Sequence, residues 1–395
     1  MNSTPIETFS PGRPGGLPPQ PALDQAVDRA LSCLGRLPPA GLTVLVNDPQ
    51  RHTDSHAVLR LLCERLGSSP LRVLAACGSH RFDQAARQRF EAPLREAAPF
   101  VTVRWHDARA ADLVAVGSRG WRGHPWLLDA PALLAVGSVE PHYFAGFTGA
   151  HKTATIGCAA YREIESNHAH ALSSDCRPCR LEGNPIHEGV RDMVRSLESL
   201  RPVAAVNLVQ AGPRVLAAAG GRPLDALQEL EPFCRECFTR RIDRQADAVI
   251  VQADGPLGRS FYQADKAIKN NEWAVRDGGV MVLEAPCQDG IGQDAFVRLL
   301  REAPTWRQAA DLVARQGYRL GDHKSVRLRH LTDPACRGVR VFAVSEGLGQ
   351  ADAAVLALTK AESAEQALEQ AGIDPARDRV LRVQDAGNLC LVVGC

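Results

Sequence analysis

The segment "LTVLVNDPQRHTDSHAVLRLLCERLGSSPLRVLAACGSHRFD", residues 42–83, decides the fold class. It contains two short apolar runs, 42–47 and 71–77, which are typical of strands covered on both faces. Between them, residues 55–67 carry apolar side chains at helical spacing and stop at Gly67. The order of strand, helix and strand predicts a parallel α/β sheet.

The same alternation continues along the chain. Further apolar runs predict strands at 100–105, 132–139 and 203–209, and a helical pattern covers 82–94. A basic, cysteine-bearing stretch at 233–245 marks a break. Beyond it the patterns predict strands at 247–253, 280–286, 339–347 and 389–394 and helices at 262–279 and 363–372.

We therefore expect an α/β protein with two α/β domains, mostly parallel sheets and an active-site cleft between the domains. The Pro/Gly-rich residues 1–21 predict a flexible N-terminal arm. The N-terminal domain is expected at 22–236 and a smaller C-terminal domain at 244–395.

Composition limits the function classes. Hydrophobic residues make up 45% of the 395-residue chain and charged residues 23%, an ordinary globular balance. The net charge of +1 argues against nucleic acid or an anionic membrane as the partner. No apolar run approaches the roughly 18 residues of a membrane span, and the N-terminus lacks the apolar core of a secretion signal. We expect a cytoplasmic protein whose twelve cysteines are mostly free thiols.

Two CxxC pairs stand out, Cys176/Cys179 and Cys234/Cys237. They lie far apart in the sequence for a zinc ribbon. A structural zinc or a redox pair is one interpretation, and incidental cysteines are the other.

Polar residues follow the predicted strands at their carboxyl ends, where ligands bind in open α/β sheets. Three successive strands of the first domain, and then the second domain, deliver the following candidates: Asp48 and Arg51, His80, His142 and Lys152, and Tyr262, Gln263 and Lys266. If the two domains face each other, these side chains line one cleft.

The residue types at these positions suggest a chemistry. Arg51 and Lys266 suit a small anionic substrate, since a guanidinium holds a carboxylate with two hydrogen bonds. His80 and His142 could exchange protons on opposite sides of one carbon, as racemisation or epimerisation requires. The alternatives are solvated surface charges for the cations and capping or surface residues for the histidines.

Other histidines and the glycine-rich loop are weaker signals. His168 and His170 lie in a predicted helix, where positions two apart do not share a face, so at most one is a metal ligand. His170, His52, His56 and His151 are interpreted as surface residues. The loop around Gly149 and Lys152 has no Walker motif, and no GxGxxG opens a strand–helix unit, which argues against an ordinary NAD dehydrogenase.

Taken in order, six blocks resemble the lactate racemase family, whose members use a nickel-pincer nucleotide cofactor. The blocks are "NDPQRHT" (47–53), "GSHR" (78–81), "EPHYFAGFTGAHK" (140–152), "NHAH" (167–170), "EGNPIHE" (182–188) and "YQADK" (262–266). The ordered set is specific, although any single block is weak.

The resemblance implies a role for each matching residue. Lys152 would join the cofactor covalently through a thioamide, with Gly149 beside it, and His168 would ligate nickel. His80 and His142 would be the paired proton carriers. The resemblance implies substrate contacts for Arg51, Tyr262, Gln263 and Lys266, and a place for Asp48 near the cofactor or Arg51.

The implied reaction is hydride transfer from a 2-hydroxy acid to the cofactor, through a 2-keto acid, with hydride return to either face. The implied partners are the substrate and the proteins that make and load the cofactor, around a monomer or homodimer. Ile156-Gly157 and Gly258 depart from the family pattern and leave open whether the acid is lactate, malate, an aryl-lactate or a sugar acid. His323 and Lys324 are expected near its distal end, and Glu165 is placed to reach His168.

Two other functions stay open. One is a carrier that binds the cofactor without catalysis. The other is a zinc-dependent hydrolase built on the histidines and the CxxC pairs, although the chain has no HExxH motif.

Overall fold

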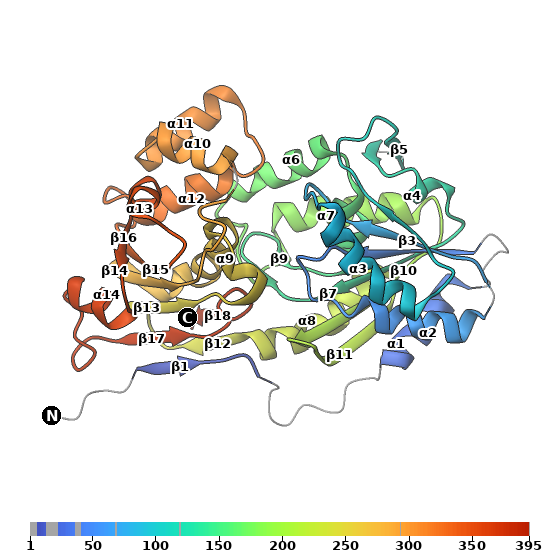
Figure 1. The fold of residues 1–395 in the computed structure, drawn as a ribbon, viewed down its shortest axis with the longest axis horizontal. Coiled ribbons are helices and arrows are strands. Elements are labelled where there is room, and N and C mark those ends of the chain that lie inside the picture. Colours follow the sequence, from blue (N-terminus) through green and yellow to red (C-terminus); the bar gives the residue numbers. More distant parts are fainter. Residues whose placement is uncertain are drawn as a thin grey trace.

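Two lobes lie side by side in the computed structural model, each built on a six-stranded sheet (Figure 1). The structure describes residues 6–12, 23–35, 41–67, 69–117, 120–292 and 294–394. We call residues 23–238 the N lobe, and residues 246–383 together with 6–12 the C lobe. The expected α/β architecture with mostly parallel sheets is confirmed.

The N-lobe sheet has the strand order β11-β10-β7-β2-β3-β4. All neighbours are parallel except β10 and β11. The strands are β2 (Leu42–Asn47), β3 (Leu71–Ala76), β4 (Thr102–Trp105), β7 (Leu133–Ser138), β10 (Val203–Ala211) and β11 (Arg214–Gly221).

Helices cover both faces of this sheet, which explains the continuous apolar runs of its strands. In β2, Val44 and Val46 pack in the core beneath one set of helices, whereas Leu45 packs in the core of the other face. The first set is α1 (Leu23–Leu34), α2 (Ser55–Leu66) and α3 (Gln84–Ala97). The second is α4 (Trp126–Asp129), α5 (Ala150–Ala154), α6 (Tyr161–Ala169), α7 (Pro185–Glu198) and α8 (Pro223–Phe238).

The C-lobe sheet has the order β1-β17-β13-β14-β15-β16, and every pair in it is parallel. Its strands are β1 (Glu7–Phe9), β13 (Ala246–Gln252), β14 (Val275–Glu284), β15 (Arg340–Val344), β16 (Leu358–Ala361) and β17 (Val380–Val383). Its helices are α9 (Phe261–Asn271), α10 (Asp294–Glu302), α11 (Trp306–Gln316), α12 (Asp322–Thr332), α13 (Gln350–Leu356) and α14 (Ala364–Gln370).

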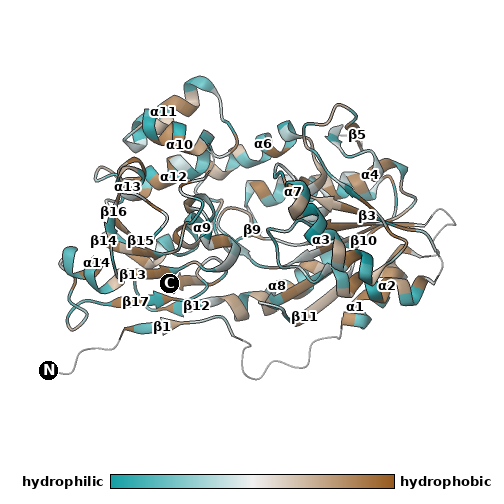
Figure 2. Ribbon diagram, viewed as in Figure 1, coloured by the Kyte–Doolittle hydropathy of each residue, from teal (hydrophilic) through white to brown (hydrophobic). Residues whose placement is uncertain are grey.

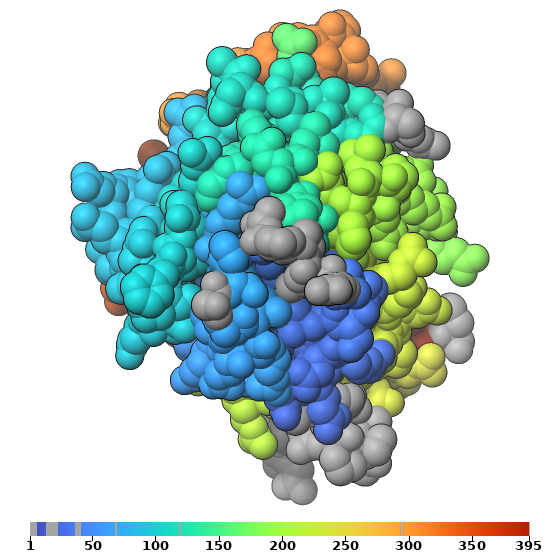
Figure 3. Space-filling view, turned by 90° about the vertical axis from the view of Figure 1, so that its right-hand side faces the viewer, coloured from blue at the N-terminus to red at the C-terminus, as the bar shows by residue number. Residues whose placement is uncertain are grey.

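In both lobes the apolar strands lie inside, and the outer faces of the helices are polar (Figure 2). The face of the molecule that Figure 3 presents is built mostly from the N lobe. None of the described helices is both long enough and apolar enough to cross a membrane.

Short elements complete the described chain. Two strands at the junction of the lobes, β12 (Thr239–Ile242) and β18 (Cys390–Val393), pair in parallel. The remaining strands are β5 (Val114–Val116), β6 (Trp121–Gly123), β8 (Pro141–His142) and β9 (Gly146–Phe147). The 3-10 turns are η1 (Ile156–Cys158), η2 (His170–Leu172), η3 (Gly255–Gly258) and η4 (Glu272–Ala274).

The structure differs from the sequence-based expectation at the N-terminus. Within the expected flexible arm 1–21, residues Glu7–Phe9 form β1, which pairs with β17 at the edge of the C-lobe sheet. Ile6 and Phe9 pack against cores on opposite faces of that sheet, and this burial orders the strand. The rest of the arm, 1–5 and 13–21, lies outside the described residues.

The single helix predicted over 262–279 is wrong at its C-terminal end. Helix α9 ends at Asn271, and β14 already begins at Val275. The side-chain amide of Asn271 donates to the carbonyls of Ala386 and Leu389, at 3.2 and 3.0 Å. These contacts come from the C-terminal part of the chain, so helical spacing within the segment could not reveal them. The strand predicted at 389–394 exists as β18, but it pairs with β12 outside the main sheet.

Gly137 in β7 allows α5 to lie directly on the sheet. A Cβ atom at this position would fall 2.3 Å from the backbone nitrogen of Ala150, much closer than two such atoms can approach. We expect Gly137→Ala to lower the free energy of unfolding by about 1–3 kcal/mol, the usual cost of overpacking. Urea denaturation measures this loss. Gly349→Ala is the control, because a Cβ there meets nothing closer than 3.6 Å. Equal stability of the two variants would contradict the close packing of α5.

Candidate active site

The carboxyl ends of neighbouring strands β7, β2 and β3 meet at one edge of the N-lobe sheet. The segments that follow these strands carry the polar residues predicted from the sequence: Asp48 and Arg51 after β2, His80 after β3, and His142 after β7.

Helix α9 of the C lobe reaches the same edge. Gln263 Nε2 donates to Gln50 Oε1 at 3.2 Å, and Lys266 Nζ lies 3.9 Å from Glu140 Oε2. Both contacts join a C-lobe residue to an N-lobe loop. The candidate residues from the two lobes are therefore brought together.

His80 is oriented by Asp48. The ring Nδ1 lies 2.8 Å from Asp48 Oδ2, and the other carboxylate oxygen accepts from the backbone N–H of Gln50 at 2.9 Å. A carboxylate only accepts hydrogen bonds, so His80 Nδ1 carries the hydrogen. In the neutral ring the lone pair is then on Nε2, where it can take a proton. Asp48 thus contacts His80, a more specific position than the sequence predicts.

His142 is buried and holds the opposite tautomer. Its Nδ1 accepts from the backbone N–H of Ala145 at 3.4 Å, so Nε2 carries the hydrogen in the neutral ring. Burial, and then the cations Lys152, Lys266 and Arg51, hold the pKa of His142 well below its usual range. The ring therefore stays neutral in the cofactor-free protein, and its Nε2–H can donate a hydrogen bond.

Lys152 lies in α5, close to the sheet. Gly149 precedes this helix with a φ of 149°, and a Cβ on it would come within 3.1 Å of the side-chain oxygen of Asn207. That oxygen accepts from the backbone N–H of Ala150 at 2.8 Å and fixes the start of α5. Asn207 is absent from the predicted site. A polar residue within the apolar run 203–209 was the signal for it.

The pKa of the Lys152 amine is lowered to a value near neutral pH. Burial, and then the charges of Arg51 and Lys266, lower the pKa of Lys152 to about 7. Within the described residues, no carboxylate lies at ion-pairing distance from its Nζ, which is 5.5 Å from the ring centre of Phe144. A large fraction of this amine is therefore unprotonated and nucleophilic near pH 7.

This lowered pKa predicts a pH-dependent stability. Between about 7 and the ordinary value of 10.5, the unfolded chain binds a proton at Lys152 that the folded chain does not. Stability of the cofactor-free protein should therefore rise with pH across this window. Lys152→Met removes the effect, so its stability advantage over the wild type should shrink as pH rises from 7 to 10.5. Urea unfolding at several pH values measures the difference, and a constant advantage would contradict the assignment.

His168 lies in the last turn of α6 and is neutral. Burial, and then Lys152, lower its pKa to about 3. Its Nδ1 is buried without a hydrogen bond, although the carbonyl of Ile164 lies close enough to oppose this shift slightly. The ring centre is 5.0 Å from that of Phe144. A carbonyl accepts hydrogen bonds, so Nδ1 carries the hydrogen and the lone pair of the neutral ring is on Nε2, which can ligate a metal ion.

Within the described part of the chain, no group of three or more His, Cys, Asp or Glu side chains is arranged to hold a metal ion. A metal at His168 would thus take most of its ligands from a bound cofactor. Of the CxxC cysteines, Cys176 and Cys234 direct their thiols at the backbone carbonyls of His170 and Val139, at 3.1 and 3.3 Å. No contact of these thiols favours the zinc hydrolase.

Arg51 and Lys266 share one partner that the predicted site lacks, Glu140. Arg51 Nη1 lies 2.9 Å from Glu140 Oε2, and Lys266 also approaches Asn388 Oδ1 at 3.4 Å. Burial, opposed by Glu140, lowers the pKa of Lys266 to about 8. The position of Glu140, just after a strand end, was the available signal.

Aromatic residues line the side of the site towards α12. The ring of His323 lies between two phenols: Tyr143 Oη is 2.9 Å from Nε2, and Tyr318 Oη is 2.6 Å from Nδ1. Lys324 donates to the carbonyl of Tyr262 at 2.7 Å and lies 3.5 Å from Asp265 Oδ2. The Lys324 charge is thus already engaged within the protein.

Some expected contacts are different in the structure. Glu165 accepts from the backbone N–H of Leu320 at 3.1 Å, in the C lobe, instead of contacting His168. His151, expected at the surface, is buried, with its ring centre 5.6 Å from that of His187. The close packing of α5 on β7 explains why this side chain is covered.

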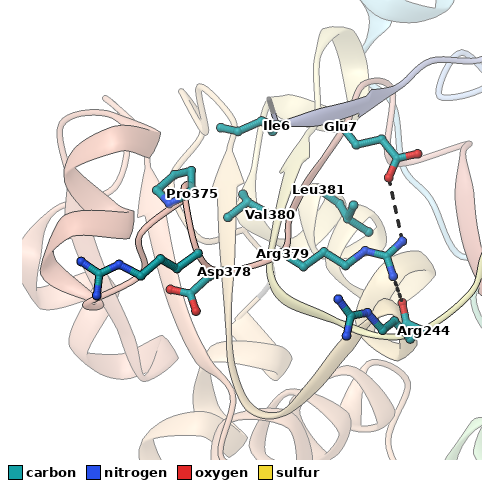
Figure 4. A pocket seen from close by; sticks show the side chains of 9 residues that line it. Ile6, Glu7, Arg244, Pro375, Asp378, Arg379, Val380 and Leu381 are labelled. Carbon is teal, nitrogen blue, oxygen red and sulfur yellow. Dashed lines mark hydrogen bonds and ion pairs between the residues drawn. The ribbon is translucent and has the colours of Figure 1, made fainter. Parts of the chain in front are cut away.

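A hollow of about 310 Å³ lies away from the candidate site, at the amino ends of β1 and β17 (Figure 4). Arg379 crosses it, lying 3.9 Å from Glu7 and donating to the carbonyl of Arg244 at 2.9 Å. A groove of about 1060 Å³ runs along the carboxyl ends of the C-lobe strands. Neither hollow is lined by the predicted site residues.

The fold and site together define a class: a two-lobed α/β protein in which histidines and lysines gather between parallel sheets. Residues 23–177 match the family described as "Lactate racemase N-terminal domain", and residues 242–387 match "Lactate racemase C-terminal domain". The chain belongs to the lactate racemase family.

Two curated relatives are both named lactate racemase. The protein of Thermoanaerobacterium thermosaccharolyticum is 30% identical over 277 residues, which span 66% of this chain and 63% of the relative. The protein of Lactiplantibacillus plantarum is 23% identical over 283 residues, spanning 68% of this chain and 66% of the relative. The matched part of the chain thus spans slightly under two thirds of each relative.

Solved structures share the fold. The lactate racemase apoprotein of T. thermosaccharolyticum superposes with a TM-score of 0.83 at 22% identity, covering 99% of this chain and 96% of that one. A protein from Thermotoga maritima gives a TM-score of 0.72 at 15% identity, covering 94% of this chain and 97% of that one.

Proposed function

We propose that this chain is a racemase or epimerase of a 2-hydroxy acid that uses a covalently tethered nickel-pincer nucleotide. The observation that carries the proposal is a pair of histidines after strands at one sheet edge: His80, oriented by Asp48 with a free Nε2 lone pair in its neutral ring, and His142, buried beside Lys152, Lys266 and Arg51. Inversion of a carbon needs an acid and a base at once, and the two can exchange roles when the reaction runs backwards.

The residues fit the cofactor. Lys152 offers an amine that is partly neutral near pH 7 for the covalent link, and His168 offers a neutral imidazole for nickel. Gly149 lets the chain approach closely, since its φ of 149° is disfavoured for other residues. When bound, the cofactor supplies a hydride acceptor and donor for the Cα hydrogen, with a planar 2-keto acid as the substrate's intermediate state.

The remaining roles belong to the protein. Arg51 and Lys266 bind the substrate carboxylate, and Gln263 and Tyr262 orient the substrate from the C-lobe side. One histidine removes the proton of the 2-hydroxyl group and becomes an imidazolium. The other must be an imidazolium when the substrate binds, and it returns a proton to the substrate oxygen on the opposite face. Asp48 keeps His80 in the tautomer that this exchange requires.

The proposal implies specific surroundings for the protein. Cofactor-biosynthesis proteins would load it, a small 2-hydroxy acid would be its substrate, and it would act as a monomer or homodimer. A reducing compartment, the cytoplasm, suits its twelve cysteines.

The test is a panel of chiral 2-hydroxy acids incubated with protein co-produced with the cofactor-making enzymes. The panel contains lactate, malate, an aryl-lactate and a sugar acid, and chiral chromatography scores inversion. We expect inversion of at least one acid in both directions. Protein that carries the cofactor and inverts none of them would instead be a carrier.

A further inference from the structure

Glu140 lies where a substrate carboxylate is expected to bind. Its Oε2 is 2.9 Å from Arg51 Nη1 and 3.9 Å from Lys266 Nζ, so one oxygen faces both cations. Arg51 belongs to an N-lobe loop and Lys266 to α9 of the C lobe. Glu140 therefore links the two lobes through the cations that would bind the substrate.

The backbone holds Glu140 in a fixed place. Its N–H donates to Thr148 Oγ1 at 3.1 Å, and the Thr148 N–H donates back to its carbonyl at 2.9 Å. Thr148 Oγ1 in turn donates to the carbonyl of Ser138, the last residue of β7, at 2.7 Å. The backbone of Glu140 is thus anchored to the sheet, so its short side chain can hold the longer side chains of Arg51 and Lys266 in position.

Glu140 remains ionised in this setting. Burial acts to raise its pKa, but Arg51 and then Lys266 outweigh burial and keep the pKa below the ordinary value. Its side chain is 16% exposed. A carboxylate this enclosed is weakly screened by solvent, so its charge acts strongly on neighbouring groups.

The charges around Glu140 leave room for one substrate carboxylate. Arg51 and Lys266 contribute two positive charges and Glu140 one negative charge, so a single carboxylate balances these three groups; Asp385, which also acts on Lys266 and Glu140, adds no cation. Lys324 offers no spare charge, since it is engaged by Asp265 and by the Tyr262 carbonyl. A second substrate carboxylate in this part of the site would be repelled by Glu140, and neither Arg51 nor Lys266 would be left to pair with it.

We propose that Glu140 is a positioning and specificity-determining residue: it holds Arg51 and Lys266 together across the lobes and restricts the site to acids with one carboxylate. The inference deepens the proposed function and rests on it for the identity of the bound acid. Its substrate class is the monocarboxylic 2-hydroxy acids, with dicarboxylic acids excluded.

The test compares Glu140→Gln with the wild type. Isothermal titration calorimetry on cofactor-loaded protein measures the Kd of lactate and of malate, each as both enantiomers. We expect the wild type to bind lactate more tightly. Glu140→Gln should shift the ratio of the two affinities towards malate by about tenfold or more, because a full negative charge a few ångström from the ligand is removed.

Two further variants control for structural effects. Glu198→Gln removes a similarly enclosed carboxylate, 13% exposed and paired with Arg222 on the N lobe, and should leave the ratio unchanged. Glu140→Asp keeps the charge on a shorter side chain. It should keep the wild-type ratio while weakening both affinities, since the reach to Arg51 is lost. Thermal unfolding confirms that each variant is folded.

The outcomes separate this inference from the proposed function. Calorimetry needs no turnover, so a shifted ratio supports the role of Glu140 even if no acid is inverted. An unchanged ratio in folded Glu140→Gln overturns the inference, and it leaves the racemase standing if the wild type inverts its substrate. Failure of the wild type to bind either acid, or tighter wild-type binding of malate, also overturns it.

Discussion

Replacing Lys152 with alanine should abolish covalent loading of the cofactor and reduce turnover to that of cofactor-free protein. The link requires a neutral amine, and burial with the nearby cations Arg51 and Lys266 lowers the Lys152 pKa to about 7. The close packing of α5 on Gly137 fixes where this amine lies. The measurement is the mass of the peptide bearing residue 152, together with nickel content, after co-production with the cofactor-making enzymes.

The control is Lys360→Ala in the C lobe. Lys360 donates to the carbonyl of Leu348 and contacts none of the candidate site residues, so this variant should load normally. Active wild-type protein whose Lys152 peptide carries no added mass would rule out the covalent link. Loading of Lys152→Ala at wild-type levels would do the same.

Replacing His142 with asparagine should leave cofactor loading intact and lower kcat by roughly 10²–10⁴-fold, the usual contribution of a positioned acid or base. The asparagine oxygen can still accept from the Ala145 N–H, as His142 Nδ1 does. The substitution therefore removes mainly the Nε2–H that we assign to proton transfer. Chiral chromatography of both reaction directions, alongside the mass of the loaded protein, measures the effect.

The matched variant is His80→Asn, which should be similarly slow and similarly loaded. His330→Asn serves as the control, because His330 packs against Trp306 in the C lobe and touches none of the candidate site residues. Wild-type rates in loaded His142→Asn would exclude this histidine from proton transfer. Loss of the cofactor from the same variant would reassign it to cofactor binding.

Much of the fold was predictable from local pattern. The run at 42–47 matches β2 residue for residue, and 71–77 overlaps β3 to within one residue, because strands covered on both faces need continuous apolar sequence. The placement of Asp48 and His80 followed from these two strands, and that of His142 from the run that forms β7. Polar residues that follow parallel strands share one edge of the sheet. The roles of Lys152 as the covalent link to the cofactor and of His168 as the nickel ligand were implied by the family resemblance, and they stay predictions.

Other features depend on contacts between distant segments, which no local pattern encodes. The pairing of Glu140 with Lys266 joins the two lobes, and so does the bond between Tyr143 and His323. The tautomers of His80 and His142 depend on Asp48 and on one backbone N–H. The end of α9 at Asn271 likewise depends on the backbone carbonyls of Ala386 and Leu389, more than 100 residues later.

Strand β1 has a consequence for how the molecule is made. The hydroxyl of Ser10, just after this strand, donates a hydrogen bond to the side-chain oxygen of Gln384, which lies 374 residues later in the sequence. Strand β1 itself pairs with β17. During synthesis β1 leaves the ribosome long before its partner strand, because Glu7 pairs with Leu381. This edge of the C-lobe sheet can therefore close only after residue 383 has been made, and pairing between such distant segments is slow in folding. A fragment that begins after residue 240 would leave the β17 edge bare and open to pairing with other chains.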